Sequence, residues 1–352
     1  MLNNKILYLL LLFLAGIQIG GRAQSDCSRD LKQAVEMYEM GLYQQAITLL
    51  SRGIENCDYV EQEWLTAYKT LISCYLEIDE IEEADKLLRR FLKENPIYKP
   101  FSTDPIPFAN AIKQYAIRPK FSIYYNMGIN LYFPEVQTNN SIWESADYSQ
   151  PYTKTTGNVL VYGMKYYLTN SFSISTGLMY NTYHFSREIL AFQYFNINYT
   201  ETYNTFEVPL QVNYSFWSDK LFYPSVNAGV FVSRLAVAKS DAIISDKFVS
   251  TTGSQLNYED AIKGIPMKDN RDLNNYGWYA GVALNCNVRR WVFSLSASYS
   301  ADFNNYINAG SMYSTEELFY DYYYIDNTVK RSSLNFTFGI NYNLIYKIKP
   351  KY

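Results

Sequence analysis

The chain has very little of what catalysis and metal binding require. It holds one histidine, His184, and no G-x-S-x-G motif accompanies it. Its four cysteines show no C-x-x-C spacing, and no further histidine is present to complete a zinc site. A serine–histidine mechanism would rest on His184 alone, at the end of a predicted strand, where an interfacial side chain is commoner than a base. The sequence predicts no catalytic residue, no metal site and no cofactor, and so a protein that is not an enzyme.

Basic charge is also scarce. Lysine and arginine number 31 against 34 aspartates and glutamates, which gives a formal charge of −3. A nucleic-acid partner would require a basic stripe, so none is predicted. The tyrosine-rich stretches 147–154 and 315–326 could stack on a sugar or a protein, or pack on each other. The second stretch is acidic, but it lacks the regular spacing of a calcium loop. Any small-molecule ligand is unknown.

Long apolar runs are missing after Arg22. Residues 1–23 predict a secretory signal peptide, with Lys5 in the positive region, the apolar stretch 6–16, and cleavage after Ala23. The apolar stretch is shorter than the ~20 residues that a transmembrane helix needs. Whatever part of the mature chain lies in a membrane must therefore cross it as strands.

Residues 24–118 have a helical period and predict a small α-helical domain. Two segments, 34–57 and 72–96, superpose at an offset of 38 residues. The corresponding pairs are Ala46 with Ala84, Leu50 with Leu88, and Ile54 with Leu92. Residues 107–117 supply a capping helix.

The pattern Gly41, Tyr43, Ala46, Ile47 resembles the tetratricopeptide repeat. The second copy departs from it, with Asp79 in place of the glycine. Stacked hairpins of this kind present a concave binding face, although a spacer is the alternative. The candidate residues for docking a partner protein are Tyr38, Tyr43 and Tyr75.

A disulfide between Cys27 and Cys57 is predicted, because the two cysteines flank the first hairpin and export places them where disulfides persist.

Residues 119–352 have a period of two. In the stretch KFSIYYNMGINLYF (120–133), one set of alternate residues is apolar and the other holds Ser, Asn, Gly and Tyr. The polar faces are nearly uncharged, as the interior of a narrow barrel demands, whereas a soluble sandwich would expose charges there. The sequence therefore predicts eight antiparallel strands in a transmembrane barrel of the outer membrane. The seven further strands are expected at 160–168, 171–182, 205–216, 224–232, 276–288, 291–299 and 333–346.

The connections between these strands alternate in length. Short turns are expected at Thr169–Ser171, Trp217–Lys220 and Arg289–Arg290. Short turns of such barrels lie in the periplasm, so the helical domain is predicted to be periplasmic. Long surface loops are expected at 134–157, 185–202, 238–275 and 303–331.

Lys165 and Glu207 fall on interior-facing positions. They could form a charge gate in a pore, or a buried pair that ties the lumen together. An eight-stranded barrel is just wide enough to be filled by its own side chains, which favours the pair.

Three stretches, 205–216, 223–235 and 275–300, resemble the outer-membrane barrel family of Bacteroidota that includes PorT-like proteins. The residues that carry the resemblance are Glu207, Pro209, Gly229, Gly277 and Gly281. It implies an outer-membrane barrel, and some members of that family belong to type IX secretion or gliding assemblies. The last strand also resembles a barrel-assembly signal, through Thr337, Gly339, Tyr342, Leu344 and the terminal Tyr352.

Together these features predict a non-enzymatic anchor or adaptor of the outer membrane. Its helical repeats and long loops would bind other outer-membrane or periplasmic proteins, in a secretion, gliding or barrel-assembly complex. The alternative is a small channel or a ligand-binding barrel.

Overall fold

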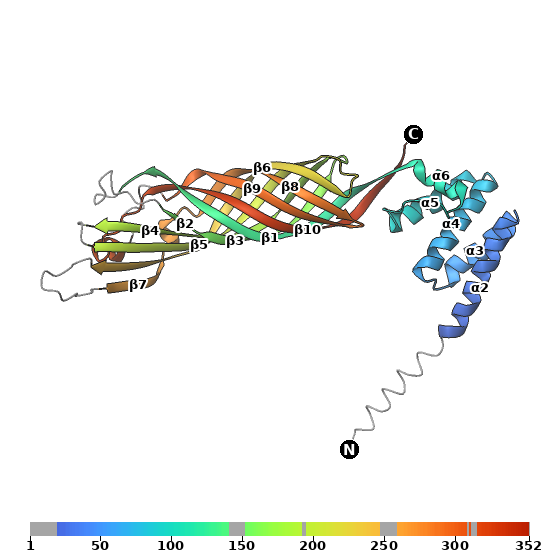
Figure 1. Ribbon diagram of the computed structural model, residues 1–352, viewed down its shortest axis with the longest axis horizontal. Helices are drawn as coiled ribbons and strands as arrows, with labels where there is room; N and C mark the ends of the chain where they lie inside the picture. The colour runs from blue at the N-terminus through green and yellow to red at the C-terminus, as the bar shows by residue number, and fades with distance from the viewer. Residues whose placement is uncertain are drawn as a thin grey trace, which may run out of the picture. The chain divides into compact units, whose positions relative to one another are not determined.

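The computed structural model describes residues 20–140, 152–191, 195–246, 259–307, 310 and 315–351 (Figure 1). The chain divides into two compact units. One comprises Met1–Arg118 with Tyr346–Tyr352, and the other is Pro119–Ile345.

The first unit is built from helical hairpins. Gly41 and Asp79 stand 38 residues apart, at equivalent places in the turns of two hairpins, and both have positive φ, +79° and +61°. Aspartate tolerates this left-handed conformation better than most residues, so the second hairpin keeps the turn without a glycine. The helices are α2 Gly20–Glu39, α3 Tyr43–Asn56, α4 Glu61–Glu77, α5 Ile81–Glu94 and α6 Ile106–Lys113.

Ala46 and Leu50 are buried in one hydrophobic cluster of this unit, and their counterparts Ala84 and Leu88 are also buried. A disulfide joins Cys27 to Cys57, with 6.0 Å between the two Cα atoms. No described helix is both long enough and apolar enough to cross a membrane.

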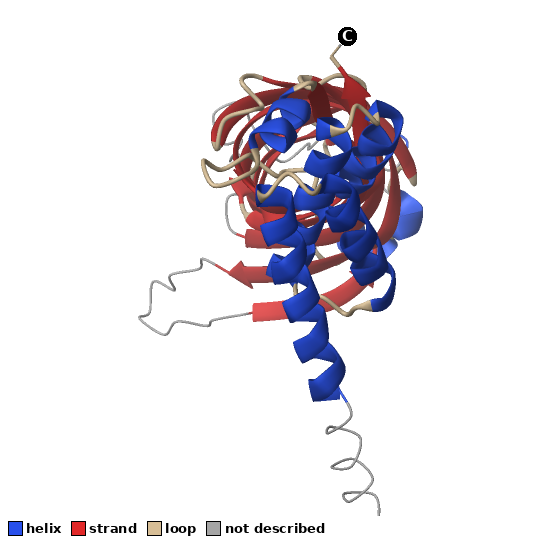
Figure 2. Ribbon diagram, turned by 90° about the vertical axis from the view of Figure 1, so that its right-hand side faces the viewer, coloured by secondary structure: helices blue, strands red, loops and turns tan. Residues whose placement is uncertain are grey.

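The second unit is an antiparallel ring of eight strands, as the sequence predicts. The hydrogen-bonded order is β1-β3-β4-β5-β6-β8-β9-β10, and β10 pairs with β1 again. Figure 2 shows the strands closing into this ring. Two short strands lie outside it: β2 pairs with β4, and β7 pairs with β6. The bounds are β1 Tyr115–Thr138, β2 Thr153–Lys154, β3 Thr156–Tyr167, β4 Phe172–Ala191, β5 Phe195–Ser215, β6 Phe222–Asp246, β7 Glu259–Pro266, β8 Asn274–Val288, β9 Trp291–Ile307 and β10 Thr328–Pro350.

The two faces of each ring strand differ in the predicted sense. On β1, Ser122 and Asn130 point inward and are fully buried, whereas Met127 and Ile129 point outward and are 46% exposed. Such outward apolar side chains occur on every strand of the ring and form a continuous band. Soluble proteins rarely expose an apolar surface of this extent. Its members include Met164, Leu178, Leu210, Val230, Val282, Leu295 and Phe338.

Four strands run well beyond this apolar band, which corrects the prediction of long loops at 185–202 and 238–275. β4 and β5 form a hairpin that continues to Ala191 and from Phe195, and β6 continues to Asp246 and pairs with β7. Figure 1 shows these extensions at the end opposite the tight turns. We call this end the loop end and the other the turn end.

The polarity of the strands inverts where they leave the band. On the outward face of β4, Leu178 and Tyr180 give way to Thr182 and His184. On its inward face, the polar positions up to Asn181 give way to Tyr183 and Phe185, both buried. Strands that enter water must be polar outside and can be apolar inside. The alternation is therefore kept and only its sense is reversed.

Candidate functional site: a crossed lumen beneath a tyrosine-rich head

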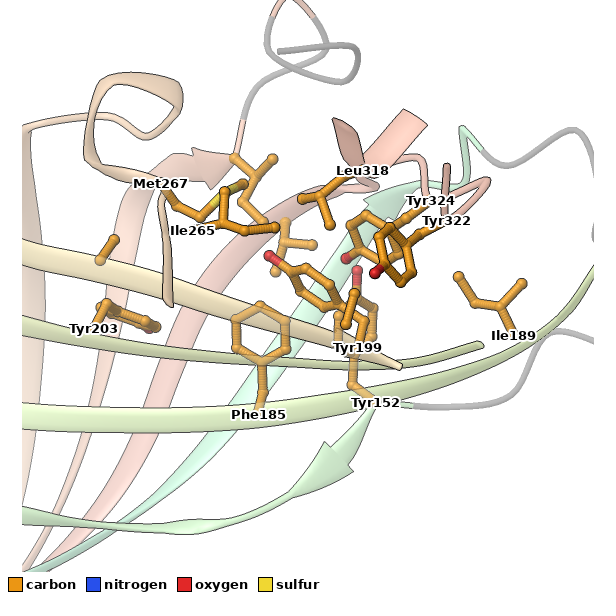
Figure 3. Close-up of a cluster of buried hydrophobic side chains, with 14 of the residues drawn as sticks. Tyr152, Phe185, Ile189, Tyr199, Tyr203, Ile265, Met267, Leu318, Tyr322 and Tyr324 are labelled. Atoms are coloured by element: carbon orange, nitrogen blue, oxygen red, sulfur yellow. The ribbon is translucent and has the colours of Figure 1, made fainter. Parts of the chain in front are cut away.

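The extended strands at the loop end enclose a hydrophobic cluster of their own, which we call the head (Figure 3). Two pairs of stacked tyrosines organise it. The aromatic rings of Tyr199 and Tyr324 lie 3.8 Å apart, and those of Tyr203 and Tyr306 lie 4.3 Å apart. The head therefore has a packed core, which a set of independent loops would lack. Its buried aromatic members are Tyr132, Tyr152, Tyr183, Phe185, Tyr199, Tyr203, Tyr306, Tyr322 and Tyr324.

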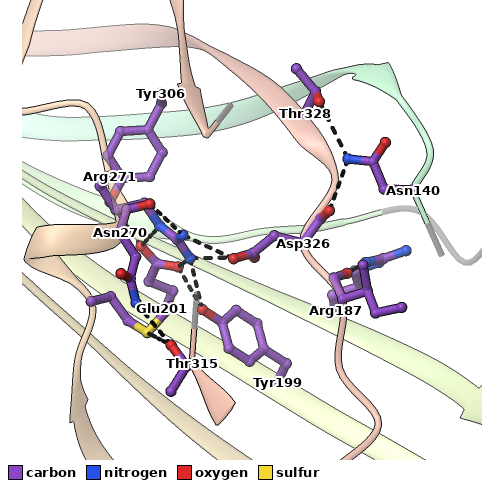
Figure 4. Close-up of polar contacts among 12 residues, drawn as sticks. Asn140, Arg187, Tyr199, Glu201, Asn270, Arg271, Tyr306, Thr315, Asp326 and Thr328 are labelled. Carbon is purple, nitrogen blue, oxygen red and sulfur yellow. Dashed lines mark hydrogen bonds and ion pairs between the residues drawn. The ribbon is translucent and has the colours of Figure 1, made fainter. Parts of the chain in front are cut away.

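A buried ion cluster lies within the head (Figure 4). The Arg271 guanidinium donates to both oxygens of Glu201, with Nη2–Oε2 at 2.6 Å and Nε–Oε1 at 3.0 Å. It also donates from Nη1 to Asp326 Oδ2 at 2.9 Å. The Tyr199 and Tyr306 hydroxyls donate to Glu201 at 2.6 and 2.8 Å. The cluster thus joins β5, β9, the segment before β8 and the segment before β10.

The pKa values of this cluster follow from its burial and its pairing. Burial opposes the charged form of Arg271, but Asp326 and Glu201 outweigh it and raise the pKa of the guanidinium well above its ordinary value. Burial raises the pKa of Asp326, and the neighbouring Arg271 offsets this only in part. Arg271 is therefore a fixed cation that holds two carboxylates together.

A second ion cluster, which we call the lock, lies deeper in the ring. Arg331 Nη1 lies 2.9 Å from Glu207 Oε1, and Arg331 Nη2 lies 2.8 Å from Asp302 Oδ1. All three side chains are at most 4% exposed. Glu207 is on β5 and Arg331 on β10, the fourth and eighth strands of the ring order, which are opposite one another. The Arg331–Glu207 pair therefore crosses the lumen.

The structure does not form the predicted pair of Lys165 and Glu207. Lys165 is opposite Ser175 in the sheet, and Ser175 is opposite Gln211. Glu207 is four residues further along β5, which at ~3.3 Å per residue places it about 13 Å away along the strand. Glu207 instead pairs with Arg331, and Lys165 Nζ lies over the Tyr124 ring, 6.0 Å from its centroid.

Two small cavities lie in the lumen, with volumes of about 80 and 70 Å³. Both are lined by Asn126, Gln211, Asn227 and Ser296, so they adjoin. Their size is enough for several water molecules each. The lumen thus has room for water within the ring and is crossed by side chains towards the loop end.

The residues of the predicted assembly signal are divided between the faces of β10. The Thr337 hydroxyl contacts the Ser296 hydroxyl in the lumen. The Tyr342 ring lies 4.6 Å from that of Trp291, and Leu344 is 41% exposed. Gly339 is buried on the inner face, and Tyr352 lies outside the described residues.

The three tyrosines predicted as docking residues are half-buried. Tyr38, Tyr43 and Tyr75 all pack against the hydrophobic cluster formed by α2, α3 and α4. The rings of Tyr38 and Tyr43 lie 5.8 Å apart. These tyrosines therefore contribute to the packing of the hairpins, and each leaves part of its ring at the surface.

His184 and the acidic stretch 315–326 are both among the described residues. His184 lies on the outward face of β4, with Nδ1 2.8 Å from Thr202 Oγ1. Glu316 and Glu317 begin the short helix α7, Glu316–Tyr320, whereas Asp326 is held by Arg271. Within the described part of the chain, no three His, Cys, Asp or Glu side chains gather to hold a metal ion.

Sequence reasoning missed Arg331, Asp302, Arg271 and Glu201, and it marked Asp326 only as part of the acidic stretch 315–326. Three of them could have been found by continuing the inward period beyond the predicted strand ends. Each of the three lies an even number of positions from an inward-facing residue of its own strand. The pairs are Glu201 with Glu207, Asp302 with Ser298, and Arg331 with Asn335. Arg271 lies outside the strands, and no local pattern marks it.

No protein-family model matches the chain, and no curated protein matches it. The PorT-like resemblance therefore stays a prediction. Among solved structures, Neisserial surface protein A is 10% identical, with 64% of this chain and 97% of that chain covered and a TM-score of 0.31.

OprG from Pseudomonas aeruginosa is 7% identical, with 64% and 96% covered and a TM-score of 0.34. The outer membrane protease OmpT from Escherichia coli is 8% identical, with 65% and 98% covered and a TM-score of 0.22. At these scores the likenesses carry no argument about location or activity.

Proposed function

We propose that this protein is a non-enzymatic anchor of the outer membrane that carries binding domains on both sides of the bilayer. The observation that supports this most directly is the lock. A buried Arg331 that bridges Glu207 and Asp302 across an eight-stranded ring occupies the space through which a solute would pass. The apolar band would then fix the ring in lipid, and the barrel would hold the chain in place without conducting.

The orientation follows from the connections. Short turns of outer-membrane barrels are periplasmic and long connections are external. The head would then lie outside the cell, and the helical unit, which precedes β1 at the turn end, would lie in the periplasm.

The helical unit would act as an adaptor of the tetratricopeptide type. Its support is the repeat itself, since equivalent turns at Gly41 and Asp79 and equivalent buried residues recur after 38 residues. The partners would be other envelope proteins, in a secretion, gliding or barrel-assembly complex. The stated resemblance to PorT-like proteins is the reason for naming these processes.

A small channel or a ligand-binding barrel is the second candidate, and the two lumen cavities favour it. Planar-bilayer recording separates the two functions. The anchor predicts no stable single-channel current from the wild type, nor from Glu207→Ala, which leaves Arg331 and the head tyrosines in the lumen. Stable currents from either protein would contradict the anchor.

The adaptor role needs a separate experiment. Two forms of the protein would serve as bait for affinity capture from detergent-solubilised membranes. One is the full chain, and the other lacks residues 28–117. The proposal expects a periplasmic partner that only the full chain recovers. Identical recovery by both chains, or recovery by neither, would count against an adaptor.

A further inference from the structure

The cavity nearer the turn end contains a cation without a protein counter-charge. Lys165 lines this cavity and is half-buried. Among the described residues no carboxylate lies within ion-pair distance of its ammonium, and no acceptor forms a hydrogen bond with it; the contact it makes is with the Tyr124 ring. Its three N–H donors must therefore be satisfied by whatever fills the cavity.

The carboxylates of the lock do not neutralise Lys165. Glu207 and Asp302 are both bound to Arg331, and Glu207 is about 13 Å from the level of Lys165 by the strand spacing. The lock as a whole carries one negative charge in excess, and Lys165 carries one positive charge nearer the turn end. The negative charge of the lock and the positive charge of Lys165 thus lie at different positions along the strands. The cavity nearer the turn end is the positive one.

Neutral donors line the same cavity as the ammonium. Asn126, Gln211 and Asn227 line the same cavity from β1, β5 and β6, and their amide N–H groups donate to no described residue. Ser294 adds a hydroxyl to its wall, whereas the Ser175 hydroxyl in the same wall already donates to Gln211 Oε1. Amide and hydroxyl donors around one ammonium suit an anion, because each can point a hydrogen at it without requiring a formal charge.

We propose that this cavity is a binding site for a small monovalent inorganic anion such as chloride, with Lys165 as its charge partner and the three amides as hydrogen-bond donors. A volume of about 70 Å³ admits a halide with a few waters. A single uncompensated cation matches a single negative charge, and the excess charge of the lock repels a more highly charged anion. This site goes beyond the anchor function and does not depend on it.

The first test uses the full-length protein in detergent. Its thermal unfolding is compared in sodium chloride and in sodium gluconate at equal ionic strength, because gluconate is too bulky for the cavity. Binding to the folded state should raise the midpoint by about 3 °C for each tenfold rise in chloride above the dissociation constant. The chloride-minus-gluconate difference should vanish in Lys165→Met.

The matched control is Lys220→Met, at the turn between β5 and β6, where the ammonium lies over the Trp217 ring. It should keep the wild-type chloride response. Equal midpoints for the wild type in the two salts, or a response that persists in Lys165→Met, would overturn the proposal.

The second test does not depend on the variants folding. Crystals of the wild type grown in bromide should show an anomalous peak in this cavity, within hydrogen-bond distance of Lys165 Nζ. Ordered water alone at that place would overturn the proposal.

Discussion

Arg331 is held between two carboxylates that would otherwise repel each other in a poorly solvated interior. Because all three groups of the lock are buried, the energetic cost of a substitution depends on which charge remains. Loss of Glu207 leaves a balanced pair of Arg331 and Asp302. Loss of Arg331 leaves two buried carboxylates without a cation, which is the costlier state.

We therefore expect Arg331→Met to destabilise the barrel by about 3–5 kcal/mol and Glu207→Gln by clearly less. Unfolding in denaturant, in detergent micelles, measures both. The double variant serves as the control, because removing both charges should recover part of the loss. A larger cost for Glu207→Gln than for Arg331→Met would show that the lock does not act in this way.

Asp104 organises the last part of the helical unit. Its carboxylate accepts hydrogen bonds from Lys69 Nζ at 2.8 Å, the Tyr98 hydroxyl at 2.6 Å and the Phe101 amide at 2.8 Å. Burial by itself would raise the pKa of Asp104, but these hydrogen bonds prevail and lower it below its ordinary value of 3.8.

A lowered folded-state pKa means that the carboxylate stabilises the fold above the unfolded-state pKa. This stability is lost as the pH falls through the lower, folded-state pKa. We expect the helical unit to weaken below about pH 4, and Asp104→Asn to cost about 1–3 kcal/mol at neutral pH. Helix melting followed by circular dichroism measures both. In Asp104→Asn the acid sensitivity should be reduced, and unchanged sensitivity would argue against this assignment.

Lys165 and Glu207 also show what the sequence could reveal of the site. The period of two assigned both residues to the inner face. It could not give their height on the ring, because height depends on the register between neighbouring strands. Register follows from pairings such as Lys165 with Ser175 and Ser175 with Gln211, and a single strand contains no information on them.

At the scale of the element, the eight ring strands were predictable because outward-facing apolar residues alternate with small polar ones. Their ends were not predictable by the same rule. On β4, the switch at Thr182 and Tyr183 reverses the sense of the alternation, and a search for apolar outward faces stops there. A search for alternation of either sense would continue through Phe185, until the charged Arg187 interrupts the apolar inward face.

We therefore expect the head to unfold separately from the part of the strand ring that carries the apolar band. Phe185 is 1% exposed in the head core, so Phe185→Ala should cost the head about 3–5 kcal/mol. We expect faster proteolysis within residues 182–204 and an unchanged heat-dependent mobility shift of the barrel in SDS gels. Ser186→Ala, on the outward face of the same strand, is the control and should leave both unchanged. Loss of the mobility shift in Phe185→Ala would mean that head and ring form one cooperative unit.

At the scale of the whole molecule, the chain consists of two compact units with different stabilising devices. The ring has a continuous hydrogen-bond ladder, whereas the helical unit has short helices, two hydrophobic clusters and a disulfide. The two units should respond differently to reduction.

Reduction of the Cys27–Cys57 bridge, which spans 30 residues, should cost the helical unit roughly 3 kcal/mol. Thermal unfolding with and without reductant, followed in the helical and the strand signals, measures this. The helical transition should shift downward while the strand transition stays in place. Cys74→Ser tests for a contribution of the buried free thiol, and it should preserve the effect of reductant. A shift of both transitions would show that the units are coupled.

The pairing of β10 with β1 has a consequence for biogenesis. At Gly128 of β1 a methyl group would lie 1.9 Å from the Phe336 carbonyl oxygen of β10, so the seam between the two strands is tightly fitted. The strand that completes the cylinder, β10, is synthesised after the other seven strands of the ring. Until it arrives, both margins of the nascent sheet have unsatisfied amides, which hydrocarbon does not tolerate. In the proposed membrane location, we therefore expect the ring to enter lipid only once this seam can close.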